Sequence, residues 1–299
     1  MDCVCKRKGI ILSGGKGSRL YPITKGISKQ IVPIFDKPMI YYPLSTLMLS
    51  GIEQILIITK EEDKDVFKNL LGDGSQLGIS IEYAIQHSPD GIAQAFTIAK
   101  NFLGDSPAAL ILGDNLFHGD CLIDKLKNCN SKKNGASIIA CPVKDPERYG
   151  VVYFDSTQKV VNIEEKPLKP KSNLAVTGLY YYDNTVCDRV KELKPSGRGE
   201  LEITDLNNLY LKDNQLWIEK MGRGMVWLDT GTFDSLHEAS SYIRTIEHRQ
   251  DLKVGCPEEV AWRMGYINNE QLEKLAKPLY KSGYGTYLLN LLKEHQFHI

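Results

Sequence analysis

Short apolar runs alternate with amphipathic segments along the first half of the chain. The apolar runs have the length of strands and occupy residues 9–12, 54–59, 79–86, 108–114 and 135–143. Between them, residues 39–50 and 91–103 repeat apolar side chains at helical spacing. Apolar strands that alternate with helices are typical of a sheet with helices on both faces. The pattern therefore predicts a doubly wound α/β sheet.

The second half of the chain follows a different rhythm. After about residue 145, β-rich stretches dominate: GVVYFD, VVNIEEKP, AVTGLYYYD, QLWIEKM and RGMVWLD, the last at 223–229. From Phe233 onward the pattern is mostly helical, and SLHEASSYIRTIEHRQ is its clearest helix. We expect one continuous domain: a Rossmann-like mixed sheet with β-rich insertions, followed by C-terminal helices.

Composition and charge limit the classes of partner. The 299 residues are 42% hydrophobic and 25% charged, and 37 basic residues balance 37 acidic ones. A net charge of zero gives no electrostatic reason to expect a nucleic acid or a membrane as partner. Seven scattered cysteines include Cys3 and Cys5 but no CxxC pair, which favours reduced thiols over a zinc site. We expect a cytoplasmic protein.

The segment GIILSGGKGSRL, residues 9–20, carries the first candidate chemistry. Three glycines, Gly14, Gly15 and Gly17, stand with two cations directly after an apolar strand. Glycine permits close approach to the backbone, and clustered N–H groups with cations suit a phosphate chain. The segment is not a Walker A loop, and Leu20 replaces the third glycine of a dinucleotide fingerprint. A tight turn alone would explain the glycines, whereas the cations favour phosphate.

Two aspartates stand where apolar strands are predicted to end. Asp114 follows AALIL, and Asp229 ends MVWLD. Ligands of open α/β sheets bind outside the carboxyl ends of strands, where a carboxylate fits a Mg²⁺ that bridges phosphate oxygens. A turn or a helix N-cap would also explain Asp114.

The chain resembles the sugar-nucleotide pyrophosphorylases in many blocks that occur in one order. From about Arg7 onward these are LSGGKGSRLYP…SKQIVPIFDKPMIYYPLSTLMLSGI, SPDGIAQAF, LILGDNLF, DPERYGVV, EEKPLKPKSNLAVTGLYYYD, GELEITD, WLDTGT and LKVGCPEEVAWRMGYI. Within the family, the blocks are most similar to members that use dTTP and glucose 1-phosphate. One small departure is Ser18, where the family often has threonine.

The resemblance implies a reaction, a fold and an assembly. The reaction is dTTP plus α-D-glucose 1-phosphate giving dTDP-glucose plus diphosphate, with Mg²⁺, as the first step toward dTDP-deoxysugars such as dTDP-L-rhamnose. The fold is of the nucleotide-diphosphosugar transferase type. A catalytic core over 7–232 comprises a nucleotide-binding part (about 7–145) and a sugar-phosphate-binding part (about 146–232). Residues 233–299 form a mostly helical interface or regulatory segment of a homotetramer, with feedback by dTDP-L-rhamnose.

The resemblance also assigns residues. Arg19 and Lys29 neutralise the departing phosphates, Lys166 binds the sugar phosphate, and these three are the expected catalytic residues. Asp114 and Asp229 are the expected metal ligands. The expected nucleotide-binding residues are Leu12, Gly14, Gly15, Gly17, Ser18, Arg19, Lys29, Gln30, Gln86, Pro89, Gly91 and Asp114. The expected sugar-phosphate-binding residues are Asn115, Gly150, Glu164, Lys166, Val176, Glu200 and Trp227; a core position is an equal alternative for Trp227.

The side-chain chemistry agrees with these assignments. Positioning and charge neutralisation dominate phosphoryl-type transfer, and the attacking phosphate is already ionised, so no general base is needed. The amides of Gln30 and Gln86 present a donor and an acceptor to the imide edge of the base, with Gly91 beneath the ring. Thymine and uracil share that edge, so we expect some use of UTP.

Three other functions remain open at this point. The first is a nucleotidyltransferase for UTP or for another sugar 1-phosphate, which the block SPDGIAQAF disfavours. The second is an NAD(P)-dependent dehydrogenase, which the missing third glycine disfavours. The third is an inactive binding protein, which the presence of all five charged site residues disfavours: Arg19, Lys29, Asp114, Lys166 and Asp229.

Overall fold

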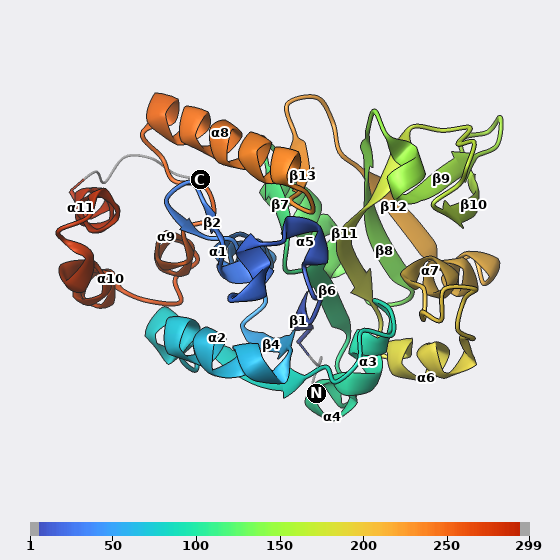
Figure 1. Ribbon diagram of the computed structural model, residues 1–299, viewed down its shortest axis with the longest axis horizontal. Coiled ribbons are helices and arrows are strands. Elements are labelled where there is room, and N and C mark those ends of the chain that lie inside the picture. Colours follow the sequence, from blue (N-terminus) through green and yellow to red (C-terminus); the bar gives the residue numbers. More distant parts are fainter. Residues whose placement is uncertain (1–5, 294–299) are drawn as a thin grey trace.

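A nine-stranded mixed sheet forms the centre of the protein, described here by a computed structural model over residues 6–293 (Figure 1). Seven strands follow the order β10-β9-β11-β6-β1-β4-β5, and β8 joins β11 to β12. The strands are β1 (Lys8–Ser13), β4 (Gln54–Thr59), β5 (Ser80–Ile85), β6 (Ala108–Leu112), β8 (Ala136–Pro142), β9 (Gly150–Phe154), β10 (Val160–Glu165), β11 (Leu174–Tyr182) and β12 (Leu216–Lys220). The predicted mixed α/β sheet is confirmed.

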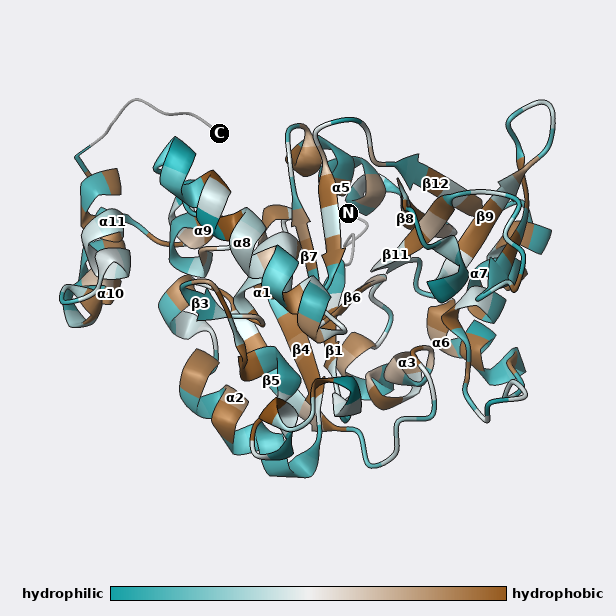
Figure 2. Ribbon diagram, turned by 45° about the horizontal axis from the view of Figure 1, so that its top comes forward, coloured by the Kyte–Doolittle hydropathy of each residue, from teal (hydrophilic) through white to brown (hydrophobic). Residues whose placement is uncertain are grey.

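The first half of the sheet is parallel. β1 lies between β4 and β6, and β5 extends the sheet beyond β4. Ile10, Ile11 and Leu110 are fully buried, because helices cover both faces of these strands. Figure 2 shows hydrophobic residues concentrated in the central strands and hydrophilic residues on the outer helices. The apolar runs of the sequence therefore become the central strands.

The second half of the sheet is mainly antiparallel and forms the predicted β-rich part. β11 pairs antiparallel with β6, β8 and β9, and all nine of its residues are buried. β9 and β10 form a hairpin whose register shifts between Val160 and Asn162. This β-bulge changes which side chains of β10 face the core.

Two short strand pairs lie outside the main sheet. β7 (Asn115–His118), which the sequence pattern did not indicate, pairs antiparallel with β13 (Val226–Asp229). The register places Asp229 opposite Asn115. β2 (Pro33–Ile34) pairs with β3 (Lys37–Pro38) in a small hairpin. The β7–β13 pair brings two candidate site segments together that are far apart in the sequence.

The helices agree in part with the predicted ones. α1 (Tyr41–Leu49) confirms the helix predicted over 39–50. The segment 91–103 is not one helix but two, and its first residues are not helical because Leu201 binds the backbone of Asp90 and Ala93. These two are α3 (Gln94–Ile98) and α4 (Lys100–Leu103). Helices that the pattern did not indicate are α2 (Lys64–Leu71), α5 (Leu122–Ser131), α6 (Val186–Arg189) and α7 (Ile203–Lys212).

The described residues after Phe233 are mostly helical, as predicted, and contain four α-helices. They are α8 (Phe233–Gln250), α9 (Pro257–Arg263), α10 (Asn269–Ala276) and α11 (Gly283–Leu291). A capping box between Thr232 and Ser235 begins α8. α9, α10 and α11 lie together at one end of the molecule, opposite β9 and β10 (Figure 1). Their buried residues belong to the same hydrophobic core as α1.

No helix within residues 6–293 combines the length and the apolar character needed to cross a bilayer. Free thiols are found at Cys121, Cys129, Cys141, Cys187 and Cys256. Cys3 and Cys5 lie outside the described residues.

Candidate active site

The glycine loop, residues 14–17, follows β1 at the carboxyl edge of the parallel strands. A β-carbon at Gly14 would lie 1.9 Å from Gln86 Oε1, so a side chain here would displace the Gln86 amide. Gly17 has a φ of +61°, in the left-handed region that favours glycine. The tight turn leaves exposed positions that can meet a ligand: Gly15, Lys16, Ser18 and Arg19.

Lys29 and Asp114 form a largely buried ion pair at this edge. The Lys29 side chain is 7% exposed and the Asp114 side chain 20%. Burial alone would raise the pKa of Asp114, but the Lys29 ammonium outweighs it, so the pKa lies below its usual value. Asn115 Nδ2 also donates a hydrogen bond to Asp114 Oδ1 at 2.9 Å. Asp114 is therefore held ionised and in one orientation.

Asp229 lies beside Asp114 because of the β7–β13 pairing. Arg148 Nη2 is 3.6 Å from Asp229 Oδ2. The pKa of Asp229 is raised, first by burial and then by the negative charge of Asp114. The two carboxylates are thus close enough to repel each other, with cations on either side.

These two carboxylates fit a hard divalent cation. Carboxylate oxygens are ligands that Mg²⁺ accepts, and two close negative charges are relieved by a cation between them. Across residues 6–293, no cluster of three or more His, Cys, Asp or Glu residues is available as a complete protein cage. The donor set is that of a Mg²⁺ whose remaining positions belong to phosphate and water oxygens.

A cavity of about 440 Å³, here called the strand-end cavity, opens at this point. Predicted site residues from both halves of the chain line it: Arg19, Asp114, Asn115, Gly150, Lys166, Val176, Trp227 and Asp229. Lys166 has a φ of +46°, which is uncommon for a residue with a side chain. Such backbone conformations occur preferentially at functional sites.

The structure places Glu164, a predicted sugar-phosphate-binding residue, outside the strand-end cavity. Glu164 is exposed and does not line the strand-end cavity, whereas the next residue, Glu165, does. Successive side chains of a strand point to opposite faces, and the β-bulge at 160–162 decides which face Glu165 occupies. Glu165 Oε2 accepts a hydrogen bond from Thr204 Oγ1 at 2.6 Å.

Glu200 likewise does not line the strand-end cavity. Its side chain is 42% exposed and lies 3.6 Å from Arg198 Nη2. Arg198 contacts Glu165 Oε1 from the same guanidinium nitrogen, at 3.5 Å. Glu200 therefore lies at the edge of the site, and Arg198 connects it to Glu165 in the cavity wall.

Asn115 and Trp227 are bound to each other. Asn115 Oδ1 accepts hydrogen bonds from Trp227 Nε1 at 2.5 Å and from the Gly178 backbone N–H at 3.1 Å. Asn115 is 2% exposed, and its amide nitrogen is used by Asp114. The amide of Asn115 therefore orients the carboxylate and the indole. Trp227 lines the cavity and also packs against the main hydrophobic core.

A second cavity, of about 460 Å³, lies over the glycine loop and is here called the loop cavity. It collects residues that follow three parallel strands: Gly14 and Lys16 after β1, Lys60 and Glu61 after β4, and Gln86, His87 and Pro89 after β5. Gly14, Gln86 and Pro89 were predicted to bind nucleotide. The convergence of strand ends is the expected place for a ligand in this fold class.

Nine of the twelve predicted nucleotide-binding residues are not in the wall of the loop cavity. Arg19 and Asp114 line the strand-end cavity instead, and the other seven line neither cavity: Leu12, Gly15, Gly17, Ser18, Lys29, Gln30 and Gly91. Gln30 is buried, and its Oε1 accepts a hydrogen bond from Ser28 Oγ at 2.9 Å. A β-carbon at Gly91 would lie 2.4 Å from the Leu201 carbonyl oxygen. The need for glycine at position 91 thus comes from contact with the chain at Leu201.

Several cavity residues were not identified from the sequence. Arg148 and Tyr149 lie in the quoted block DPERYGVV, and Thr204 lies in GELEITD, so the segments were found but not these side chains. Glu165 was missed because the resemblance was assigned to the neighbouring Glu164, although alternation from the buried Ile163 places Glu165 on the inner face of β10. Tyr180 was not identified because it lies in a strand that is buried throughout.

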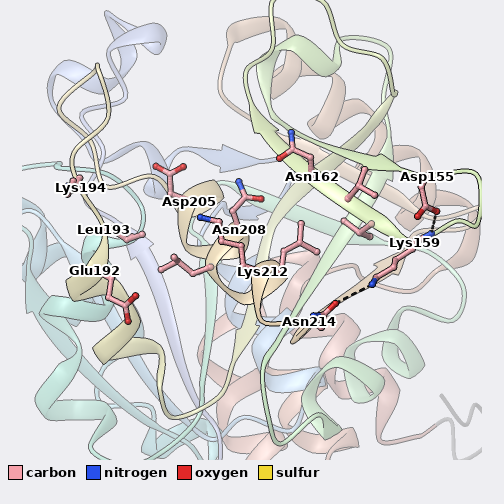
Figure 3. Close-up of a pocket in the computed structure, with 14 residues that line it drawn as sticks. Asp155, Lys159, Asn162, Glu192, Leu193, Lys194, Asp205, Asn208, Lys212 and Asn214 are labelled. Carbon is pink, nitrogen blue, oxygen red and sulfur yellow. Dashed lines mark hydrogen bonds between the residues drawn. The ribbon is translucent and has the colours of Figure 1, made fainter.

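A larger, open hollow of about 690 Å³ lies elsewhere, between the β9–β10 hairpin and α7 (Figure 3). Its walls carry both acidic and basic side chains, and several of these bind one another. Lys159 Nζ donates to Asn214 Oδ1 at 3.2 Å, and Asp155 Oδ1 accepts from the Lys159 backbone N–H at 3.0 Å. The hollow lies away from the carboxyl ends of the parallel strands, where ligands of this fold class bind.

Comparison with known proteins agrees with this geometry. The nucleotidyl transferase family model matches residues 8–246. A glucose-1-phosphate thymidylyltransferase of Neisseria meningitidis is 56% identical over 96% of this chain and 100% of its own length. One from Xanthomonas campestris is 57% identical over 98% of this chain and 99% of its own. A Bacillus anthracis structure with a sucrose has a TM-score of 0.73 at 44% identity, covering 80% of this chain and 95% of that one.

Proposed function

The chain belongs to the nucleotidyl transferase family, and from this premise we propose that it converts dTTP and α-D-glucose 1-phosphate to dTDP-glucose and diphosphate. One observation carries the proposal: the glycine loop contributes Gly14 and Lys16 to the loop cavity, and Arg19, just after it, lines the strand-end cavity. A triphosphate on this loop reaches both spaces.

In this proposal the nucleoside occupies the loop cavity and the sugar phosphate the strand-end cavity. A phosphate oxygen of glucose 1-phosphate attacks the α-phosphorus, the bond to the β-phosphate oxygen breaks, and diphosphate leaves with the electron pair. Backbone N–H groups of the loop, with Arg19 and Lys29, bind the departing phosphates. Lys166 binds the attacking phosphate, and Glu165 accepts hydrogen bonds from sugar hydroxyls.

Asp114 and Asp229 are the proposed Mg²⁺ ligands. When bound, the cation neutralises negative charge on the phosphate oxygens. Asn115 keeps the Asp114 carboxylate in its orientation, and Lys29 keeps it ionised. We expect Asp114→Asn or Asp229→Asn to lose nearly all turnover and to weaken Mn²⁺ binding in calorimetric titration, with the circular dichroism spectrum unchanged. A double variant that remains active and metal-dependent would contradict this assignment.

The proposed reaction is tested by diphosphate release. Purified protein is mixed with Mg²⁺, glucose 1-phosphate and one of dTTP, UTP, dATP or dGTP. We expect release to be fastest with dTTP, lower with UTP, and absent without sugar phosphate or metal. Release led by UTP would keep the mechanism and change the assigned nucleotide, and no release from folded protein would contradict nucleotidyl transfer from these substrates.

The C-terminal segment 233–299 is proposed to serve in assembly and regulation, as a homotetramer with feedback by dTDP-L-rhamnose. A cavity of about 370 Å³ supports this role, since its walls combine α1, β7 and residues 250–263. Sedimentation velocity tests the tetramer. The role of the cavity is tested with His118→Ala, which should weaken inhibition by dTDP-L-rhamnose. The product would supply dTDP-deoxysugar synthesis.

A further inference from the structure

A chain of three side chains, here called the amide relay, stands behind the loop cavity. Its members are Gln86, Gln94 at the start of α3, and Asp90 in the loop between them. Gln86 Nε2 donates to Gln94 Oε1 at 2.7 Å, and Gln94 Nε2 donates to Asp90 Oδ2 at 2.9 Å. The relay is continuous from the cavity wall to an exposed carboxylate.

The carboxylate determines the direction of every hydrogen bond in the relay. An ionised carboxylate can only accept, so the group that Gln94 turns toward Asp90 must be its NH₂. The Asp90 backbone N–H, which can only donate, also contacts Gln94 Oε1 at 3.2 Å. Ser88 Oγ donates a hydrogen bond to the second oxygen of the Asp90 carboxylate. If the Gln94 amide were reversed, its oxygen would face the Asp90 carboxylate and its NH₂ would face the Asp90 backbone N–H. Both contacts would be unfavourable, so two separate contacts fix the orientation of Gln94.

The orientation of the Gln94 amide in turn fixes that of the Gln86 amide. Gln94 offers it an acceptor, so the NH₂ of Gln86 must face Gln94 and its Oε1 must face the other way, against Gly14. Gln86 is 5% exposed, which leaves its amide little freedom to rotate. One edge of this amide remains for a ligand: an acceptor oxygen with one N–H beside it. That edge complements a ring N–H flanked by a carbonyl.

We propose that Gln94 and Asp90 are positioning residues that determine base specificity by holding Gln86 in the orientation that accepts an imide N–H. This inference rests on the proposed function, because it places the base of the nucleotide in the loop cavity. Thymine and uracil present a ring N–H between two carbonyls, whereas cytosine presents an acceptor nitrogen beside an NH₂. The fixed amide therefore pairs with thymine or uracil and opposes acceptor to acceptor with cytosine.

The test compares nucleotides in variants of the relay. Gln94→Met removes both polar groups at similar length. The double variant Asp90→Asn/Gln94→Glu exchanges donor and acceptor between these two residues but still offers Gln86 an acceptor. Gln76→Met is the matched control, since Gln76 donates to the Leu71 carbonyl and lines neither cavity. Diphosphate release gives kcat and KM for dTTP, UTP and dCTP, and calorimetry gives the affinity for each nucleotide without the sugar phosphate.

In Gln94→Met we expect the preference for dTTP over dCTP in kcat/KM to fall about tenfold, the value of one neutral hydrogen bond. The change should lie in KM, with kcat for dTTP within about twofold, since no relay residue touches the reacting phosphates. The dTTP to UTP ratio should not change, because the two bases share the imide. The double variant should restore the wild-type preference.

An unchanged dTTP to dCTP preference in Gln94→Met, or an equal loss in Gln76→Met, would overturn the proposal. So would a double variant as unselective as Gln94→Met. A wild-type protein that binds dTTP better than dCTP but releases no diphosphate would contradict the proposed reaction alone. In that case the calorimetric affinities of the same variants still decide the role of the relay.

Discussion

Glu165 illustrates at the scale of a residue how one position separates a binding group from a solvated one. One oxygen of its carboxylate accepts a hydrogen bond from Thr204 Oγ1. The other oxygen lies near the cationic groups of Arg198 and Lys166. The neighbouring Glu164 is exposed and does not line the strand-end cavity. Both residues have the same chemistry, so only geometry distinguishes them.

We therefore expect Glu165→Gln and Glu164→Gln to differ sharply. Glu165→Gln should raise KM for glucose 1-phosphate by about tenfold or more, because hydrogen bonds to a charged group are lost. KM for dTTP should not change, because the base binds elsewhere. Glu164→Gln, the matched control, should leave both constants within about twofold. Steady-state diphosphate release with each substrate varied measures both, and the reverse order of effects would restore the role first predicted for Glu164.

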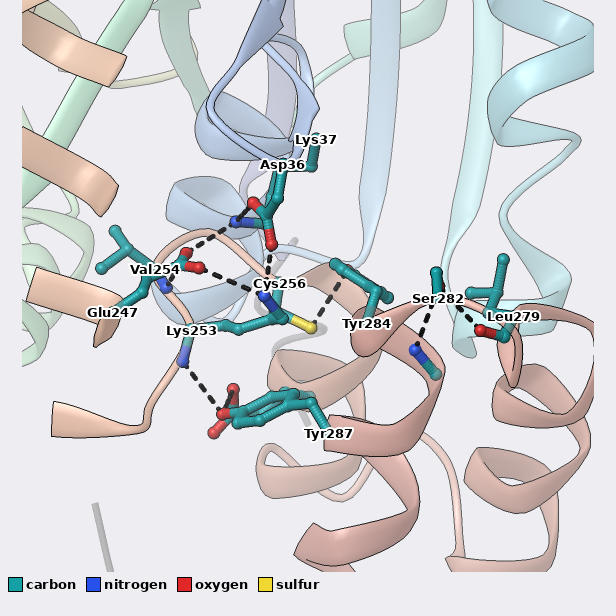
Figure 4. Close-up of polar contacts among 12 residues, drawn as sticks. Asp36, Lys37, Glu247, Lys253, Val254, Cys256, Leu279, Ser282, Tyr284 and Tyr287 are labelled. Carbon is teal, nitrogen blue, oxygen red and sulfur yellow. Dashed lines mark hydrogen bonds and ion pairs between the residues drawn. The ribbon is translucent and has the colours of Figure 1, made fainter. Parts of the chain in front are cut away.

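At the scale of elements, a buried charge network joins parts that are distant in the sequence (Figure 4). Lys37 Nζ, in β3, lies 2.5 Å from Asp36 Oδ1 and 2.7 Å from Glu247 Oε1, near the end of α8. Lys253, in the connection to α9, contacts the same two carboxylates. The side chains of Lys37 and Glu247 are 1% and 6% exposed, so the network attaches the β2–β3 hairpin to the C-terminal helices.

Removing Lys37 takes away one of the two cations that contact the carboxylates of Asp36 and Glu247, so their buried negative charge is only partly compensated. We expect Lys37→Met to lower the free energy of unfolding by about 3 kcal/mol, measured by urea titration at pH 7. Lys277→Met is the control, because the Lys277–Glu273 pair is exposed, and it should cost less than about 1 kcal/mol. Equal effects of the two substitutions would show that the network does not stabilise the attachment.

The same network has a defined pH dependence. Burial raises the pKa of Asp36, but Lys37 and Lys253 outweigh it and hold the pKa below the usual 3.8. A lowered pKa in the folded state stabilises the fold above the ordinary pKa, and that contribution is lost as the pH falls through the lowered value. In Lys37→Met, the pKa of Asp36 should rise toward its usual value, so less stability should be lost as the pH falls, which urea titrations between pH 3 and 7 measure.

At the scale of the whole molecule, the C-terminal helices are part of the core and not an attachment to it. Leu44 and Leu47 of α1 belong to one buried cluster with Val260 and Ala261 of α9 and Leu288 of α11. Each of these side chains is less than 9% exposed. The burial of α1 thus depends on residues more than 200 positions later in the chain.

We expect a chain truncated after residue 250 to lose cooperative folding. Exposing this face of α1 removes about 1.5–3 kcal/mol for each large apolar side chain that returns to water, which exceeds the margin of a typical domain after a few residues. Thermal unfolding followed by circular dichroism measures the effect. A truncated chain that unfolds cooperatively at the temperature of the full chain would mean that residues 251–293 are an independent module.

The sequence alone was sufficient for features that depend on a few neighbouring residues. The strands β1, β4 and β6 follow from continuous apolar runs, and the glycine loop follows from backbone freedom and adjacent cations. Asp114 and Asp229 could be placed at strand ends, because strand ends bear ligands in this fold class.

Tertiary structure alone decided the features that depend on partners far away in the chain. A bulge against β9 decided that Glu165, and not Glu164, meets the strand-end cavity, because one extra residue reverses the alternation of faces. The pairing of β7 with β13 places Asp229 beside Asp114. The close contact of Leu201 with position 91 is the reason why that position is glycine. Local patterns determine which elements form and which residues can do chemistry; register and packing determine which of those residues meet.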